Sequence, residues 1–107
     1  MKKIVITPRK FEMGQYTYSV KSGKKHDEDL QSRSLYGDHS GHRKHIRVDS
    51  SLSADQKHST FIHEMIEAVN CGWCNYKINH DNITNIANGL SQAFKSMGIV
   101  FDIKEND

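Results

Sequence analysis

His63, Glu64 and Glu67 are the side chains of this 107-residue sequence whose types and spacing best suit chemistry. In a helix, residues four apart lie on one face, so the His63 imidazole and the Glu67 carboxylate can hold one ion between them. Glu64 is rotated by about 100° from His63, where a carboxylate can take a proton from a water on that ion without being a ligand. The spacing therefore predicts a divalent-metal site with a general base beside it.

A third ligand must come from another element, and His80 is the candidate that the sequence favours. Position 80 is three residues before Ile83 and seven before Ala87, so it shares the inward stripe expected of a second helix. The connecting segment 71–79 is short enough to keep the two helices antiparallel neighbours. We therefore expect His80 to point toward the first helix and its metal ligands.

Two histidines and one glutamate are a recognised ligand set for catalytic zinc. They leave a fourth position for a water whose pKa falls to about 7 when the metal binds it. We expect Zn²⁺ at His63, Glu67 and His80, with Glu64 as the catalytic base.

The first metal-binding helix is expected over about residues 53–71. Ser53 with Gln56 three residues later fits a capping box, and residues 54–70 contain neither Gly nor Pro. Gly72 is expected to end the helix. Its apolar arc should pack on a sheet and consists of Phe61, Ile62, Met65, Ile66, Ala68 and Val69.

The second helix is expected over about residues 80–97. Asn79 or Asp81 can cap it, and Gly98 ends it. Apolar residues recur at helical spacing and predict one inward stripe of Ile83, Ile86, Ala87, Leu90, Phe94 and Met97.

The first half of the chain, about residues 1–50, reads as short strands and turns. Residues 4–6 and 16–20 are rich in β-branched and aromatic side chains, and 45–49 alternates polar and apolar residues, with Ile46 and Val48 predicted to face inward. We expect 45–49 to be the last strand of the small sheet. The free edge of this strand could then hold an extended peptide.

Two further segments complete the predicted fold. The polar segment 21–34 is expected to be an exposed loop or hairpin tip, and 99–103 a final strand or a cover over the core. The predicted fold class is α+β: a small antiparallel sheet of N-terminal strands packed on two antiparallel helices, in a single domain spanning residues 1–107.

Composition narrows the class of protein. Hydrophobic residues make up 36% and charged residues 26%, so the core is modest and a metal joining two elements would help folding. The formal net charge is only +2 and the basic residues are scattered, so we expect no nucleic acid partner. No run of about 18 apolar residues and no signal peptide are present, which predicts a soluble cytoplasmic protein without a membrane partner.

The segment STFIHEMIEAVN at 59–70, followed by His80 and the apolar helix 83–94, resembles the small phage-borne and bacterial metallopeptidase-like domains of the zincin class. These are similar to the ImmA/IrrE-type peptidases. The resemblance covers roughly residues 35–97. It implies a minimal zincin-like α+β fold, a zinc ion and peptide hydrolysis.

Carried over position by position, the resemblance makes His63 and Glu67 the helical zinc ligands, His80 the third ligand and Glu64 the general base. The common motif is HExxH, whereas this chain has HExxE. The carboxylate of Glu67 still coordinates zinc, but its negative charge weakens the Lewis acidity of the ion.

These observations lead to a first hypothesis of a zinc-dependent metallopeptidase that acts on a peptide or protein substrate. The alternative is a non-catalytic, metal-stabilised phage or bacterial binding protein that acts on a host protein. If the chain is phage-encoded, the host cytoplasm is its expected location.

Cys71 and Cys74 match the pattern C-x-x-C, which suits a redox disulfide, a second metal site or plain loop packing with Trp73. Packing is the favoured interpretation, because the pair follows the end of a helix, whereas redox motifs of this type begin one.

His39, His42 and His45 are spaced by three, and a solvated loop and strand face is the favoured interpretation. One of them could instead line a substrate cleft. Tyr36 and Asn70 are possible partners of the metal ligands.

Overall fold

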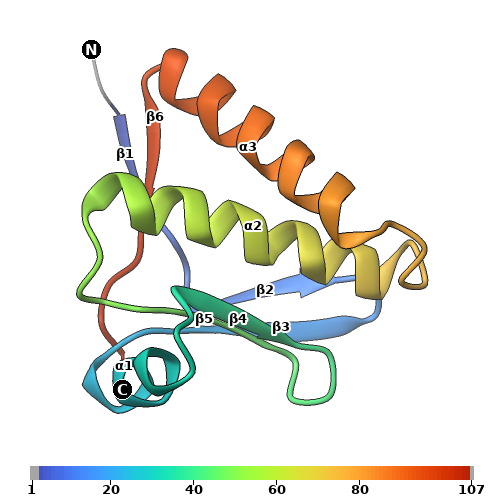
Figure 1. Cartoon of the computed structure of the whole chain (residues 1–107), viewed down its shortest axis with the longest axis horizontal. Coiled ribbons are helices and arrows are strands. Elements are labelled where there is room, and N and C mark those ends of the chain that lie inside the picture. Colours follow the sequence, from blue (N-terminus) through green and yellow to red (C-terminus); the bar gives the residue numbers. More distant parts are fainter. Residues whose placement is uncertain (1–2, 107) are drawn as a thin grey trace.

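A computed structural model describes residues 3–106 of the chain. Strands concentrate in the first half of this range and the two long helices in the second, as expected for the predicted α+β class (Figure 1). In chain order they are β1 (Lys3–Ile6), β2 (Lys10–Met13), β3 (Tyr16–Lys21), α1 (Lys24–Ser32), β4 (Gly37–Ser40), β5 (His45–Val48), α2 (Ala54–Gly72), α3 (His80–Ser96) and β6 (Ile99–Asp102).

Two sheets organise the strands. The larger has the order β2-β3-β5-β4, with β2 and β4 antiparallel to their neighbours and β3 parallel to β5. The smaller pairs β1 with β6 in parallel. The sheet is therefore mixed rather than purely antiparallel, because the chain leaves β3 through α1 and β4 before it returns as β5.

The inner face of the larger sheet forms the core, as the alternation of residues predicts. Tyr18 and Val20 of β3 and Ile46 and Val48 of β5 are buried and belong to one cluster with Phe61 of α2. β-branched and aromatic side chains at every second position place their apolar atoms on one side of the sheet. This packing sets the distance between the sheet and α2.

The helix α1 corrects the expectation that residues 21–34 form an exposed loop. Leu30 is fully buried, and the Asp27 carboxylate accepts a hydrogen bond from the backbone N–H of Ser50. Leu30 is the only apolar residue in Lys24–Ser32, so the sequence carries no helical periodicity there. Tertiary contacts of two side chains stabilise the helix instead.

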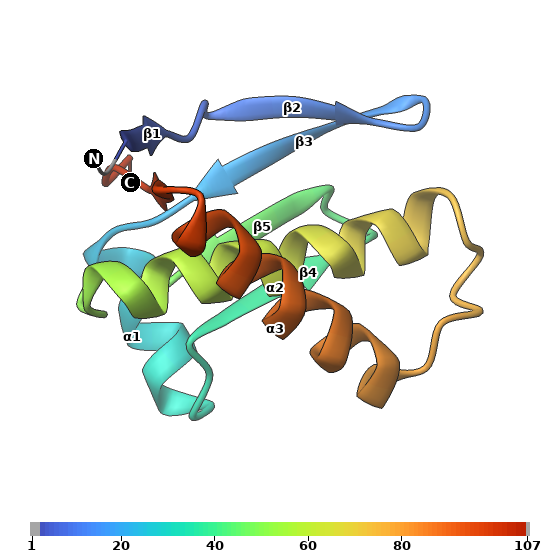
Figure 2. The same ribbon diagram turned by 90° about the horizontal axis from the view of Figure 1, so that it is seen from above.

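The long helix α2 crosses the inner face of the larger sheet (Figure 2). It begins with the predicted capping box, in which the Ser53 hydroxyl accepts from the backbone N–H of Gln56 and the Gln56 side chain accepts from Ser53 N–H. Such a box satisfies backbone N–H groups that the first turn leaves without partners. Gly72 is the last residue of the helix, as predicted.

The helix α3 runs back along α2, and the Asn79 side chain caps it by accepting from the backbone N–H of Asn82. Ile83 and Ala87 are buried against α2 as predicted. The prediction is wrong for three members of the apolar stripe, which are exposed: Ile86, Leu90 and Met97. The main contacts of the helix are with α2 and β6, so the inner edge of the stripe is covered and the outer edge faces solvent.

The prediction that 45–49 provides a sheet edge is also wrong. Its strand, β5, pairs with β3 on one side and with β4 on the other, so its backbone groups are used on both sides. The edge beside α2 belongs to β4, a strand that the sequence did not predict. Within residues 3–106, no helix is both long and apolar enough to cross a membrane.

Candidate metal site

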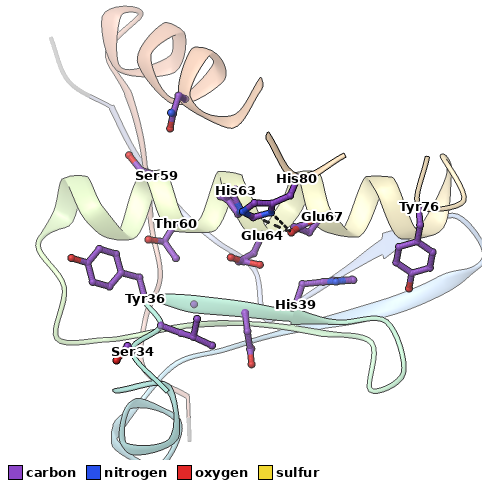
Figure 3. A pocket seen from close by; sticks show the side chains of 14 residues that line it. Ser34, Tyr36, His39, Ser59, Thr60, His63, Glu64, Glu67, Tyr76 and His80 are labelled. Carbon is purple, nitrogen blue, oxygen red and sulfur yellow. Dashed lines mark ion pairs between the residues drawn. The ribbon is translucent and has the colours of Figure 1, made fainter. Parts of the chain in front are cut away.

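Ligand atoms of His63, Glu67 and His80 lie within 4.8 Å of one another. The Glu67 carboxylate lies 4.0 Å from His63 Nε2 and 3.7 Å from His80 Nδ1, and both imidazole rings lie on the same side of it (Figure 3). The structure thus brings together the three side chains that the sequence selected. His63 and Glu67 are half-buried, whereas the His80 side chain is 72% exposed and lies at the rim.

Two different physical causes place these ligands. His63 and Glu67 are one helical turn apart on α2, so the helix alone aligns them. His80 is the first residue of α3, and the loop before it is held by Asn70, whose side chain donates to the Ile78 carbonyl and accepts from the Ile78 N–H, both at 3.0 Å. Asn70 therefore fixes the loop that delivers His80.

Glu64 lies on the side of α2 that faces β4 and points into the same cavity as the ligands. Burial raises the pKa of its carboxyl to about 8, and the charges of Glu67 and Asp38 act in the same direction. Burial lowers the pKa of His63, while Glu67 opposes that shift and His80 adds to it. A neutral imidazole is the form that binds a metal.

The cavity above these residues has a volume of about 740 Å³ and lies between β4, α2 and the start of α3. Gly37 permits this arrangement, because a Cβ atom there would lie 2.6 Å from the Arg47 carbonyl oxygen and 2.6 Å from Thr60 Cγ2. A glycine within a strand often marks such a close approach. β4 can therefore lie directly against the helix face that carries Glu64.

His39 extends the site beyond the predicted residues. It lies on β4, lines the cavity, and its Nε2 is 3.1 Å from the Tyr18 hydroxyl. Burial lowers its pKa, while Glu67 is the strongest opposing influence. Of the other two spaced histidines, His42 is exposed in a turn as expected, but His45 is buried on β5, which corrects the expectation of a solvated strand face.

The two cysteines do not form a disulfide. Cys71 and Cys74 are free thiols, and the Cys71 sulfur is 2.8 Å from the Tyr76 hydroxyl, which borders the cavity. Trp73 is 70% exposed, so the expectation that it packs in the loop is wrong. Among the described residues, the only group of ligand atoms with metal-binding spacing contains neither thiol.

Sequence reasoning missed several residues of the site, among them Gly37 and Asn88. Gly37 carried the general signal of a glycine in a short strand, but that strand was not predicted. Asn88 of α3 also lines the cavity, and nothing in its sequence position indicated it. Tyr36, considered as a partner of the ligands, does line the cavity, whereas Asn70 acts through the loop.

No protein-family model, curated protein or solved structure matches this chain. The functional conclusion depends on the geometry of the site and on the chemistry of its side chains.

Proposed function

We propose that this chain is a zinc-dependent metallopeptidase-like protein in which His63, Glu67 and His80 hold the metal and Glu64 is the general base. The observation that carries the proposal is the convergence of ligand atoms from three side chains within 4.8 Å. Two imidazoles and one carboxylate are donors that catalytic zinc sites use, with one position left open.

The distances support a single ion. Bonds of about 2.0–2.2 Å in a tetrahedral site put ligand atoms about 3.3–3.6 Å apart. The observed separations from the Glu67 carboxylate are 3.7 Å to His80 and 4.0 Å to His63. All three ligand atoms lie within 4.8 Å of one another, so side-chain movements of about 1–1.5 Å would bring them to the separations of a tetrahedral site.

Glu64 has the position that a general base needs. A zinc ion at the site would supply a Lewis acid and a bound water of lowered pKa. Glu64 would accept the proton of the attacking water and return it to the leaving amine of the peptide. A nearby divalent cation also favours the ionised carboxylate, which opposes the effect of burial on the Glu64 pKa.

The strand β4 would orient the substrate. It pairs with β5 on one side, and no described strand pairs with its other side. Gly37, Asp38 and His39 of β4 also line the cavity that contains the ligands. An extended peptide added to this edge would place its main chain along the cavity, with hydrogen bonds that do not depend on its side chains.

Metal content tests the site directly. Protein purified without added metal should contain about one zinc ion per chain, because three protein ligands bind zinc tightly. His63→Ala should lose most of it, whereas the matched variant His42→Ala, in an exposed turn, should retain it. The measurement is elemental analysis after gel filtration. Equal zinc content in both variants, or a wild-type chain that stays metal-free after incubation with zinc, contradicts the proposal.

The alternative function is a metal-stabilised binding protein without turnover, and the observation that favours it is Glu67 itself. Its carboxylate lies against both imidazoles and would reduce the Lewis acidity of the ion. Glu64→Gln separates the two functions. It should keep zinc but lower hydrolysis of an unstructured fluorescent protein substrate about 100-fold or more if the chain is a peptidase. Equal rates in both proteins would exclude Glu64 as the base.

A further inference from the structure

A second groove lies on the face of the larger sheet that α2 does not cover. Its volume is about 930 Å³, and its floor consists of side chains from β3, β4 and β5. In Figure 1 this face is the lower side of the sheet, with α1 at one end and the turn between β4 and β5 at the other. The sheet separates most of the groove from the metal ligands, although Asp38 and His39 border both cavities.

The groove concentrates positive charge. All of its lining side chains are polar, and it contains only two carboxylates, Asp29 and Asp38. The lining also contains five basic residues, which are Lys21, Lys25, Arg33, Arg43 and Arg47. Their excess of three exceeds the formal net charge of +2 for the whole chain. The rest of the protein is therefore slightly negative, and the groove is the surface that attracts anions.

The two carboxylates pair with two arginines of the groove, Arg47 and Arg33, and Arg33 lies 3.7 Å from Asp29 and 3.3 Å from Asp38. Arg47 Nη2 lies 2.6 Å from Asp38 and 2.7 Å from Asp29, and its side chain is largely buried. Such paired hydrogen bonds fix the plane of a guanidinium group. An arginine fixed in this way loses little conformational freedom when it binds an anion.

Three cations at the groove remain available. Lys21, Lys25 and Arg43 form no ion pair with a carboxylate in the part of the chain that the structure describes. They come from β3, α1 and the turn after β4, so they approach the groove from different sides. An anion bound between them would be contacted from several directions at once.

We propose that this groove binds a compact chain of phosphate groups, supplied as free polyphosphate or as the phosphate chain of a nucleotide. Lys and Arg with the hydroxyls of Ser19 and Ser40 are donors suited to phosphate oxygens. The lining contains no Phe, Tyr or Trp on which a base could stack, so the phosphates are the recognised part. The volume lies in the range of small-ligand pockets. This site does not depend on the proposed peptidase activity.

Calorimetric titration with sodium tripolyphosphate tests the groove. The wild-type chain should bind, and Lys21→Gln combined with Arg43→Gln should bind about 100-fold more weakly, because each of the two lost charged hydrogen bonds weakens binding roughly tenfold. Lys57→Gln combined with Lys77→Gln removes the same charge outside the groove and should bind as the wild type does. Equal weakening in both double variants would overturn the proposal.

Further titrations identify the class of ligand and the part of the protein that binds it. His63→Ala should bind tripolyphosphate as the wild type does, which separates this groove from the metal site. ATP binding of similar strength to tripolyphosphate supports recognition of the phosphate chain. Amide shifts on titration should cluster at residues 19–25 and 43–47. Shifts centred on 63–67, sulfate binding as strong as tripolyphosphate, or tighter binding of an oligonucleotide would each overturn the proposal.

Discussion

Asn70 shows how one buried amide can determine a site to which it does not belong. Its side chain is 4% exposed and makes two hydrogen bonds to the backbone of Ile78, two residues before His80. A buried amide that satisfies both backbone groups of a loop residue fixes the position of that loop. His80 can then reach Glu67 although its own side chain is mostly exposed.

We predict that Asn70→Ala weakens zinc binding about 10- to 100-fold, because the loop that carries His80 is no longer held. Competition with a metal chelator measures the affinity. Asn70→Asp is the matched variant, because it keeps the acceptor for the Ile78 N–H but loses the donor to the Ile78 carbonyl. Its zinc affinity should lie between that of the wild type and that of Asn70→Ala. Wild-type affinity in Asn70→Ala would show that the loop does not position His80.

The Asp38 carboxylate makes stability depend on pH in the acid range. Burial opposes its ionisation, but the hydrogen bond and charge of Arg47 outweigh burial, so the pKa of Asp38 lies below its ordinary value of 3.8. A lowered pKa in the folded state means that the unfolded chain binds more protons. The stabilisation is therefore present above about pH 4 and is lost as the pH falls through the lowered pKa.

We predict that Asp38→Asn lowers the free energy of unfolding at pH 7 by about 1.5–3 kcal/mol, the range for a hydrogen bond to a charged group. The difference from the wild type should shrink toward pH 3, where the wild-type carboxyl is increasingly protonated. Urea unfolding of both proteins at the two pH values measures this. A difference that stays constant with pH would exclude Asp38 ionisation as its source.

The close contact between β4 and α2 depends on a glycine. A Cβ atom at Gly37 would come within 2.6 Å of both the Arg47 carbonyl oxygen and Thr60 Cγ2, and it would lie 3.5 Å from Glu64 Cγ. One of these contacts is with backbone, which cannot rotate away. Any side chain at position 37 must therefore move β4 away from the helix that carries Glu64.

We predict that Gly37→Ala destabilises the protein by about 1–3 kcal/mol through this overlap. Gly89→Ala is the control: a Cβ there meets nothing within 4 Å, and alanine in a helix interior is favoured over glycine, so α3 should gain about 0.5–1 kcal/mol. Thermal unfolding of the two variants gives opposite shifts in Tm if the prediction holds. A neutral Gly37→Ala would show that β4 can move without cost.

For the molecule as a whole, the proposed metal would link two helices that already pack against each other. His63 and Glu67 belong to α2 and His80 to α3, so one ion would hold the two helices together. The outer edge of α3 contributes little packing, since Ile86 and Leu90 are exposed. Binding that occurs only in the folded state stabilises that state.

We predict that zinc at 100 times its Kd stabilises the chain by about 2.7 kcal/mol and raises Tm by about 10 °C or more. Differential scanning calorimetry with zinc and with a chelator measures the shift. His63→Ala should show the same Tm under both conditions. A zinc-dependent shift of equal size in His63→Ala would place the stabilising ion elsewhere in the protein.

Local spacing was enough to predict α2, its capping box and the shared face of His63 and Glu67. Each of these depends on residues no more than a few positions apart, and helical geometry converts such spacing directly into position. The inward face of β5, with Ile46 and Val48, was predicted for the same reason, because alternation in a strand is also local. The α+β class then followed from the order of these patterns.

Tertiary contacts decided the rest. Whether β4 or β5 forms the edge of the sheet, whether 24–32 becomes a helix, and which side of the α3 stripe is covered all depend on partners far away in the chain. In the sequence, Glu64 cannot be told from an exposed helical glutamate, and only the packing of β4 over it shields its carboxyl beside the candidate metal ligands. Long-range pairing leaves no periodic trace in a sequence, so these features appeared only in the folded chain.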